Sequence, residues 1–165
     1  MGHDAERFSV SKFRRVFVAR PPDEIESRLD PTIQQVVGKV TEELRELLLV
    51  DDNDTLRRNY PTAYPDDEHL ESDFQSMVHD QLLMSRLDAI DVVQASLSAD
   101  RFDLDTADAW MNTLNQVRLV LGDRLDIGED DIEPDEDDPD APSVMVYQLL
   151  SFLLDELTQA RMRFL

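Results

Sequence analysis

The chain has 165 residues, 37 of them acidic and 16 basic, with a formal net charge of −21 and no cysteine. This length is typical of one domain that folds around a hydrophobic core without a disulfide or a metal. The missing cysteines exclude disulfides, thiolate metal sites and cysteine nucleophiles. The negative charge disfavours nucleic acids and anionic membranes as main partners.

The sequence shows no candidate membrane span or secretory leader. No apolar run approaches the roughly 18 residues that a spanning helix needs, and the longest candidate, residues 144–157, is interrupted by Tyr147, Gln148 and Asp155. The first residues are charged and lack an apolar signal core. We therefore expect a cytoplasmic protein that makes no membrane contact.

Residues 7–20 carry the clearest β signal in the chain. Aromatic and β-branched residues occur there at alternating positions, which predicts a short hairpin or one long edge strand. Pro21 and Pro22 end this element. We expect a short helical turn over residues 23–29.

A long helix is predicted next. Asp30 and Pro31 form a typical N-cap followed by proline at the first helical position, and apolar residues recur at helical spacing through Leu49. Acids at residues 66–68 favour the start of a second helix. Its apolar stripe runs over residues 70–97, with a bend considered near His79 and Asp80.

The C-terminal third of the chain predicts two further helices around an acidic loop. The third helix starts at Asp103 or Asp105 and runs to Leu121, with either a cap at Gly122 or one more turn. Residues 127–142 hold nine acids, three prolines and no base, which favours a solvated or disordered loop. Ser143 is the expected cap of the last helix.

Together these elements predict one domain over residues 1–165, with a β element at 7–20, a helical core at 30–126, an acidic loop at 127–142 and a C-terminal helix at 143–165. The fold class is mainly α, with four to five packed amphipathic helices and a short N-terminal β-strand or hairpin. We expect the apolar faces to cover one another and to leave no pocket suited to chemistry.

Signatures of catalysis and of metal binding are missing from the sequence. His3, His69 and His79 do not show the spacing of a helical zinc motif, and the acidic run over residues 126–140 lacks the register of a calcium loop. The chain has no phosphate-binding glycine loop and no Gly-x-Ser-x-Gly motif. We expect no catalytic residue, no cofactor and no metal ligand.

Two adjacent arginines, Arg14 and Arg15, are candidate partner-binding residues in the β element. Adjacent strand residues point to opposite faces, so our first interpretation is that these bases pair with the protein's own acids. Edge pairing with a second copy or with another chain is an alternative, because an uncovered edge strand offers free backbone groups. Contact with DNA is a further alternative.

The third helix carries the other candidates. Asn115 and Arg118 lie three residues apart and share a face, and Arg124 follows shortly after. Arg118 stands between apolar neighbours, where a cation must find a partner or reach solvent. An ion pair with an acid such as Asp80 is the structural interpretation, and binding of a partner is the functional one.

Several segments taken together resemble one family. They are Arg14-Arg15, Leu29-Asp30-Pro31, Tyr60-Pro-Thr-Ala-Tyr-Pro-Asp-Asp, residues 80–87 and residues 107–125. This combination resembles the actinobacterial domain of unknown function numbered two thousand and seventeen. Some members of that family are labelled oxidative-stress transcriptional regulators. The resemblance implies no catalytic residue, and a redox role resting on cysteine does not extend to this chain.

The hypothesis that these observations favour is a non-enzymatic regulatory or adaptor protein that acts by binding another protein. We also expect a homodimer, formed through the N-terminal strand or through an apolar helix face. The alternative is a transcriptional regulator that contacts DNA through Arg14 and Arg15. The second alternative is a small metal-dependent enzyme.

Overall fold

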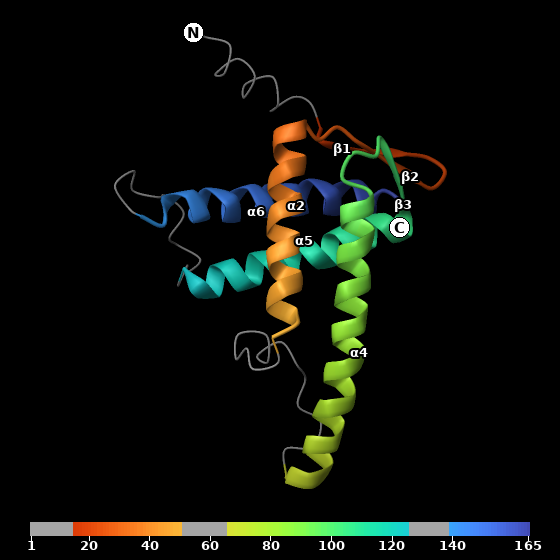
Figure 1. Cartoon of the computed structure of the whole chain (residues 1–165). Coiled ribbons are helices and arrows are strands. Elements are labelled where there is room, and N and C mark those ends of the chain that lie inside the picture. The colour runs from red at the N-terminus through yellow and green to blue at the C-terminus, as the bar shows by residue number, and fades with distance from the viewer. Residues whose placement is uncertain (1–14, 51–65, 126–138) are drawn as a thin grey trace.

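The structure is a computed structural model that describes residues 15–50, 66–125 and 139–165. Within these residues the chain forms four helices and a three-stranded antiparallel sheet, which confirms the predicted mainly α class with an N-terminal β element. Helices α5 and α6 lie side by side and cross α2 and α4, and the sheet covers one end (Figure 1). The elements are β1 (Phe17–Arg20), β2 (Glu24–Ser27), α2 (Pro31–Leu48), α4 (Glu68–Ala95), β3 (Arg101–Asp103), α5 (Leu104–Arg124) and α6 (Ala141–Met162).

The sheet contains two strands that the sequence pattern did not predict. Strand β1 ends where the two prolines were expected to end it, but residues 24–27 form β2, so the predicted helical turn over residues 23–29 is wrong. Ile25 is buried between two more exposed glutamates, which is the alternation of a half-buried strand. Strand β3 adds to β2 with Phe102 opposite Ile25. Residues 7–14 of the predicted β element lie outside the described residues.

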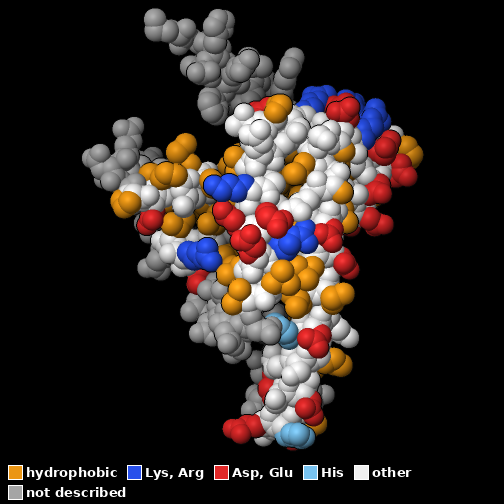
Figure 2. Space-filling view, in the orientation of Figure 1, with side chains coloured by type: hydrophobic (Ala, Val, Ile, Leu, Met, Phe, Trp, Pro, Cys, Tyr) orange, Lys and Arg blue, Asp and Glu red, His pale blue; other side chains and the backbone are white. Residues whose placement is uncertain are grey.

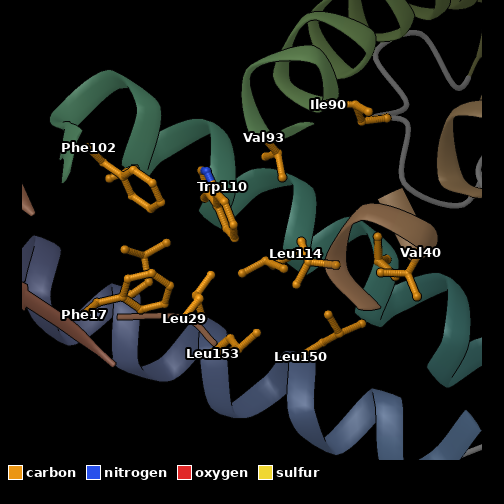
Figure 3. Packing of buried hydrophobic residues seen from close by; sticks show 14 of the residues in the cluster. Phe17, Leu29, Val40, Ile90, Val93, Phe102, Trp110, Leu114, Leu150 and Leu153 are labelled. Atoms are coloured by element: carbon orange, nitrogen blue, oxygen red, sulfur yellow. The ribbon is translucent and has the colours of Figure 1, made fainter. Parts of the chain in front are cut away.

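An aromatic cluster joins the sheet to α5. Phe17 and Phe102 point from the sheet toward Trp110 in the middle of the core (Figure 3). The rings of Phe102 and Trp110 stack with centroids 5.0 Å apart, and the ring of Phe17 meets Trp110 edge-on at 6.3 Å. Aromatic pairs in these geometries add about 0.5–1.5 kcal/mol to the effect of burial. The cluster therefore fixes the sheet against the central helix.

The buried indole of Trp110 also donates a hydrogen bond to a side chain at the C-terminal end of α4. Trp110 Nε1 donates to Ser96 Oγ over 2.8 Å, and Ser96 Oγ in turn donates to the carbonyl of Val92 over 2.6 Å. Ser96 is the residue that ends α4. The end of α4 is thus bonded to the centre of the core.

Acidic N-caps start three of the helices. The Asp30 carboxylate accepts from the backbone N–H of Ile33 over 2.9 Å, as predicted, and Asp67 plays the same part for α4. Asp103 is the cap of α5, and the hydrogen bonds from Thr106 lower its pKa below the ordinary value of 3.8. The predicted cap at Ser143 is wrong, because α6 already begins at residue 141 with a proline in its first turn.

Helix α5 passes through Gly122 rather than ending there. The helix runs to Arg124 and is capped at Leu125, so the predicted extra turn is confirmed and the predicted glycine cap is wrong. A side chain at Gly122 would place its Cβ 3.2 Å from the ring of Tyr147 on α6. Glycine at this position therefore serves the close approach of two helices.

Helix α4 is one continuous helix of 28 residues, without the break considered near His79. Its fully buried residues, Ile90 and Val93, lie near its C-terminal end. The N-terminal half projects past the other described elements (Figure 1). Two of the apolar residues there, Leu70 and Met77, are about half exposed, although the sequence assigned them to the core.

We predict that Ser96→Ala lowers the free energy of unfolding by about 1–3 kcal/mol, because the indole N–H of Trp110 loses its acceptor in a buried site. The measurement is urea unfolding followed by the fluorescence of Trp110, the single tryptophan of the chain. The matched control is Ser98→Ala, at an exposed position nearby. Equal stability of the two variants would contradict the assignment.

Candidate functional site

The predicted arginine of the β element is bound to its own chain. Arg15 Nη1 lies 3.2 Å from the carboxylate of Glu156 and also donates to Gln159, both on α6. This matches the interpretation that the strand bases pair with the protein's own acids. Arg14 lies outside the described residues.

The predicted pair on α5 is formed, but not with the expected acid. Arg118 Nη2 donates to Asn115 Oδ1 over 3.0 Å. No ion pair between Arg118 and Asp80 occurs in the described structure, and the buried Nε of Arg118 has no hydrogen-bond partner among the described residues. Arg124 lies apart from this pair, at a hollow of about 40 Å³ that Glu43 also lines.

His69 and His79 are not part of a metal-binding cluster of described residues. His69 lies 3.7 Å from Asp73, one turn further along α4. No cluster of three or more histidines, aspartates or glutamates suited to a metal occurs in residues 15–50, 66–125 and 139–165. His3 and most of the acidic run lie outside these ranges. No helix in the described ranges is long and apolar enough to cross a bilayer.

The clearest surface feature lies on the projecting part of α4. Six exposed residues spaced by three or four positions share one face of the helix, and apolar and acidic residues alternate along it. Separate orange and red side chains are visible on the projecting part of the molecule (Figure 2). We call this face the α4 ladder: Leu70, Asp73, Met77, Asp80, Met84 and Asp88.

The apolar side chains of the α4 ladder are unusually exposed to solvent for their size. Leu70 is 48% exposed, Met77 53% and Met84 62%. The half-buried residues of the same turns, such as Val78 and Leu82, lie on the opposite face, since each residue turns the helix by about 100°. Leu70, Met77 and Met84 recur every seven residues in the sequence, but this periodicity does not tell whether a neighbouring element covers them.

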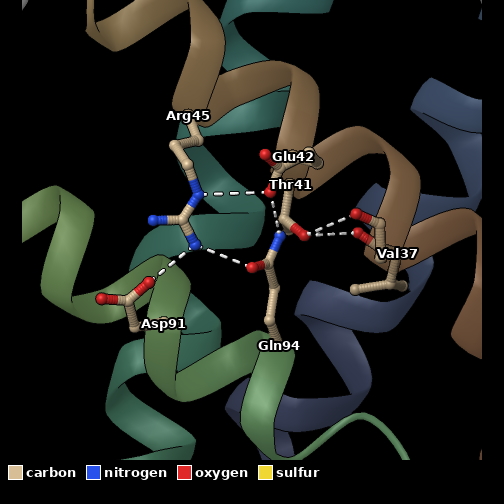
Figure 4. Close-up of polar contacts among 7 residues, drawn as sticks. Val37, Thr41, Glu42, Arg45, Asp91 and Gln94 are labelled. Carbon is tan, nitrogen blue, oxygen red and sulfur yellow. Dashed lines mark hydrogen bonds and ion pairs between the residues drawn. The ribbon is translucent and has the colours of Figure 1, made fainter.

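A polar clamp holds α4 against α2 beyond the ladder. Arg45 of α2 lies 2.6 Å from the carboxylate of Asp91 and donates to the side-chain oxygen of Gln94 over 2.7 Å. Gln94 in turn donates to Glu42 over 2.8 Å, and Glu42 also pairs with Arg45. Figure 4 shows Arg45, Glu42 and Gln94 closing a ring between the two helices, with Asp91 bound to Arg45 outside the ring.

The clamp shifts the pKa values of two of its side chains. The hydrogen bond to Asp91 raises the pKa of Arg45, with Glu42 contributing in the same direction. The hydrogen bonds from Gln94 and then from Arg45 lower the pKa of Glu42 below its ordinary value of 4.5. Both groups are therefore charged at neutral pH.

A cavity of about 240 Å³ lies on the inner side of α4, where this helix crosses α5. Leu44 and Leu82 form part of its apolar wall, and Ser85, Thr113 and Gln116 are among its polar residues. We call it the α4/α5 cavity. The described lining holds no acid and no histidine, so the expectation that packing leaves no pocket suited to chemistry stays a prediction. No motif in the sequence predicts the cavity, because residues of three separate helices line it.

We predict that Glu42→Gln destabilises the fold at pH 7 and that the difference shrinks as the pH falls. Because the folded pKa of Glu42 is lowered, its contribution is fully present above pH 4.5 and is lost as the pH falls through the folded value. Urea unfolding at a series of pH values measures this. Glu46→Gln, an exposed glutamate on the same helix, is the control. A pH-independent difference would contradict the clamp.

Comparison with known proteins gives a family and no activity. No curated protein and no solved structure matches the chain. The sequence profile of one family matches residues 11–161, which is most of the chain, and that family is described as "Domain of unknown function (DUF2017)". The chain therefore belongs to the DUF2017 family.

Proposed function

We propose that the protein acts as a regulatory or adaptor protein that binds another protein through the α4 ladder. The observation that supports this is the row of three exposed apolar side chains, Leu70, Met77 and Met84, on a helix that projects from the body. A helix face of this kind is a common platform for a partner helix. Methionine suits such a face because its side chain is flexible and polarisable.

The acidic residues of the ladder favour a partner of positive charge. Asp73, Asp80 and Asp88 alternate with the apolar residues on the same exposed face. A partner helix that alternates apolar residues with lysine or arginine would fill the apolar gaps and pair with these carboxylates. Electrostatic complementarity of this kind gives specificity and fast association. We therefore propose a basic amphipathic helix as the partner segment.

A second copy of the chain fits this face less well. Two ladders packed together would bring the same three aspartates against one another, and each chain already has a net charge of −21. Like charges brought together across an interface oppose association. The expected homodimer through an apolar helix face is thus disfavoured at α4, and dimerisation through the N-terminal strand stays a prediction.

We predict that a synthetic amphipathic helix of leucine and lysine binds the protein and that the double variant Met77→Gln with Met84→Gln weakens binding by about tenfold or more, because two central apolar contacts are lost. Titration calorimetry at physiological salt measures the affinity. The matched control is Met145→Gln on α6, where the methionine is exposed to the same degree, 63%.

Two comparisons make the result specific. A scrambled peptide of the same composition has the same charge but no apolar face, so it should bind much more weakly once salt screens the charges. Equal binding of the two peptides, or equal weakening by the α4 and α6 variants, would refute the proposal. If sedimentation shows a dimer that the α4 variant abolishes, the partner of the α4 ladder is a second copy of the chain and not a basic helix.

A further inference from the structure

The α4/α5 cavity contains polar atoms that the rest of the fold leaves unsatisfied. Thr113 is 2% exposed and lines the cavity, and its Oγ1 has no hydrogen-bond partner among the described residues. The side-chain oxygen of Gln116, one turn along the same helix, is also buried and has no hydrogen-bond partner among the described residues. Buried polar groups without partners are rare, because each costs about 1–3 kcal/mol.

The hydroxyl of Thr113 behaves differently from those of two other helical threonines, Thr41 and Thr158. Thr41 and Thr158 each donate their hydroxyl to the carbonyl four residues earlier, over 2.7 Å in both cases. Such a bond is the usual way for a threonine inside a helix to satisfy its hydroxyl. Thr113 does not make it. Its hydroxyl is therefore available to a group inside the cavity.

The lining sets the size and the charge of that group. About 240 Å³ is below the usual range of pockets for drug-sized ligands, so a single-ring molecule fits. The apolar side chains of Leu44 and Leu82 would pack on its ring. Among the described residues of the lining, Arg86 is the single charged one, and it takes part in an interaction of its own. The other polar residues of the described lining, Ser85, Asn112, Thr113 and Gln116, are uncharged, which suits an uncharged ligand.

We infer that the α4/α5 cavity binds a small uncharged molecule that presents an N–H donor beside a carbonyl acceptor, as a carboxamide or a nucleobase does. The N–H donates to the side-chain oxygen of Gln116, and the carbonyl accepts from the hydroxyl of Thr113. Both unsatisfied atoms then gain partners. This site lies on the face of α4 opposite to the ladder, so the inference does not depend on the proposed function.

The test is a titration of the full chain with nicotinamide and with uracil, followed by amide chemical shifts. Both probes should bind saturably in the millimolar range, which is reasonable for so few atoms, with the largest shifts around residues 113 and 116. Thr113→Val keeps the shape of the side chain and removes the hydroxyl, so it should weaken binding by about tenfold. Thr41→Val, in which the lost hydroxyl is bonded to Val37, should leave binding unchanged.

A second readout separates a ligand site from a structural role. Because the Thr113 hydroxyl has no partner among the described residues, Thr113→Val should not lower the free energy of unfolding of the ligand-free protein, whereas Thr41→Val should lower it. Gln116→Met gives an independent variant with the same expected loss of binding. Absence of saturable shifts, tighter binding of toluene or benzoate, or unchanged binding by both cavity variants would overturn the inference.

Discussion

Helix α4 is longer than the body that it packs against, and this mismatch governs the rest of the structure. Its 28 residues span about 42 Å, yet its fully buried residues, Ile90 and Val93, lie near one end. The clamp at Arg45 and the hydrogen bond from Trp110 to Ser96 fasten that same end. The preceding turns therefore present a face that no described element covers, and the α4 ladder lies on this face.

Two opposite faces of this helix carry the two proposals. The outer face has the alternating apolar and acidic side chains of the α4 ladder, which suit a macromolecular partner of positive charge. The inner face, together with α2 and α5, lines a half-open cavity, and Thr113 Oγ1 and Gln116 Oε1 have no hydrogen-bond partner there among the described residues. The family match adds no activity to these observations. The proposals thus rest on burial, spacing and hydrogen bonding alone.

Local signals in the sequence predicted the helices well, because caps and periodicity act over a few residues. Asp30 followed by Pro31 marked the start of α2, and the apolar spacing of α5 marked its buried face. The sequence pattern did not predict strands β2 and β3, because four and three residues are too few to show a clear period-two alternation. Exposure of Met77 and Met84 and the cavity at Thr113 depend on tertiary packing, which a one-dimensional pattern does not contain.

The exposure of the α4 ladder in solution is the claim on which the proposed function depends, and the absence of cysteine makes it directly measurable. Single cysteines introduced at Met84 and, for comparison, at Ile90 would be the only thiols in the chain. Met84→Cys should react with a thiol reagent nearly as fast as an unstructured peptide, whereas Ile90→Cys should be strongly protected. Protection of Met84→Cys to a similar degree would show that this face is covered and would contradict the account.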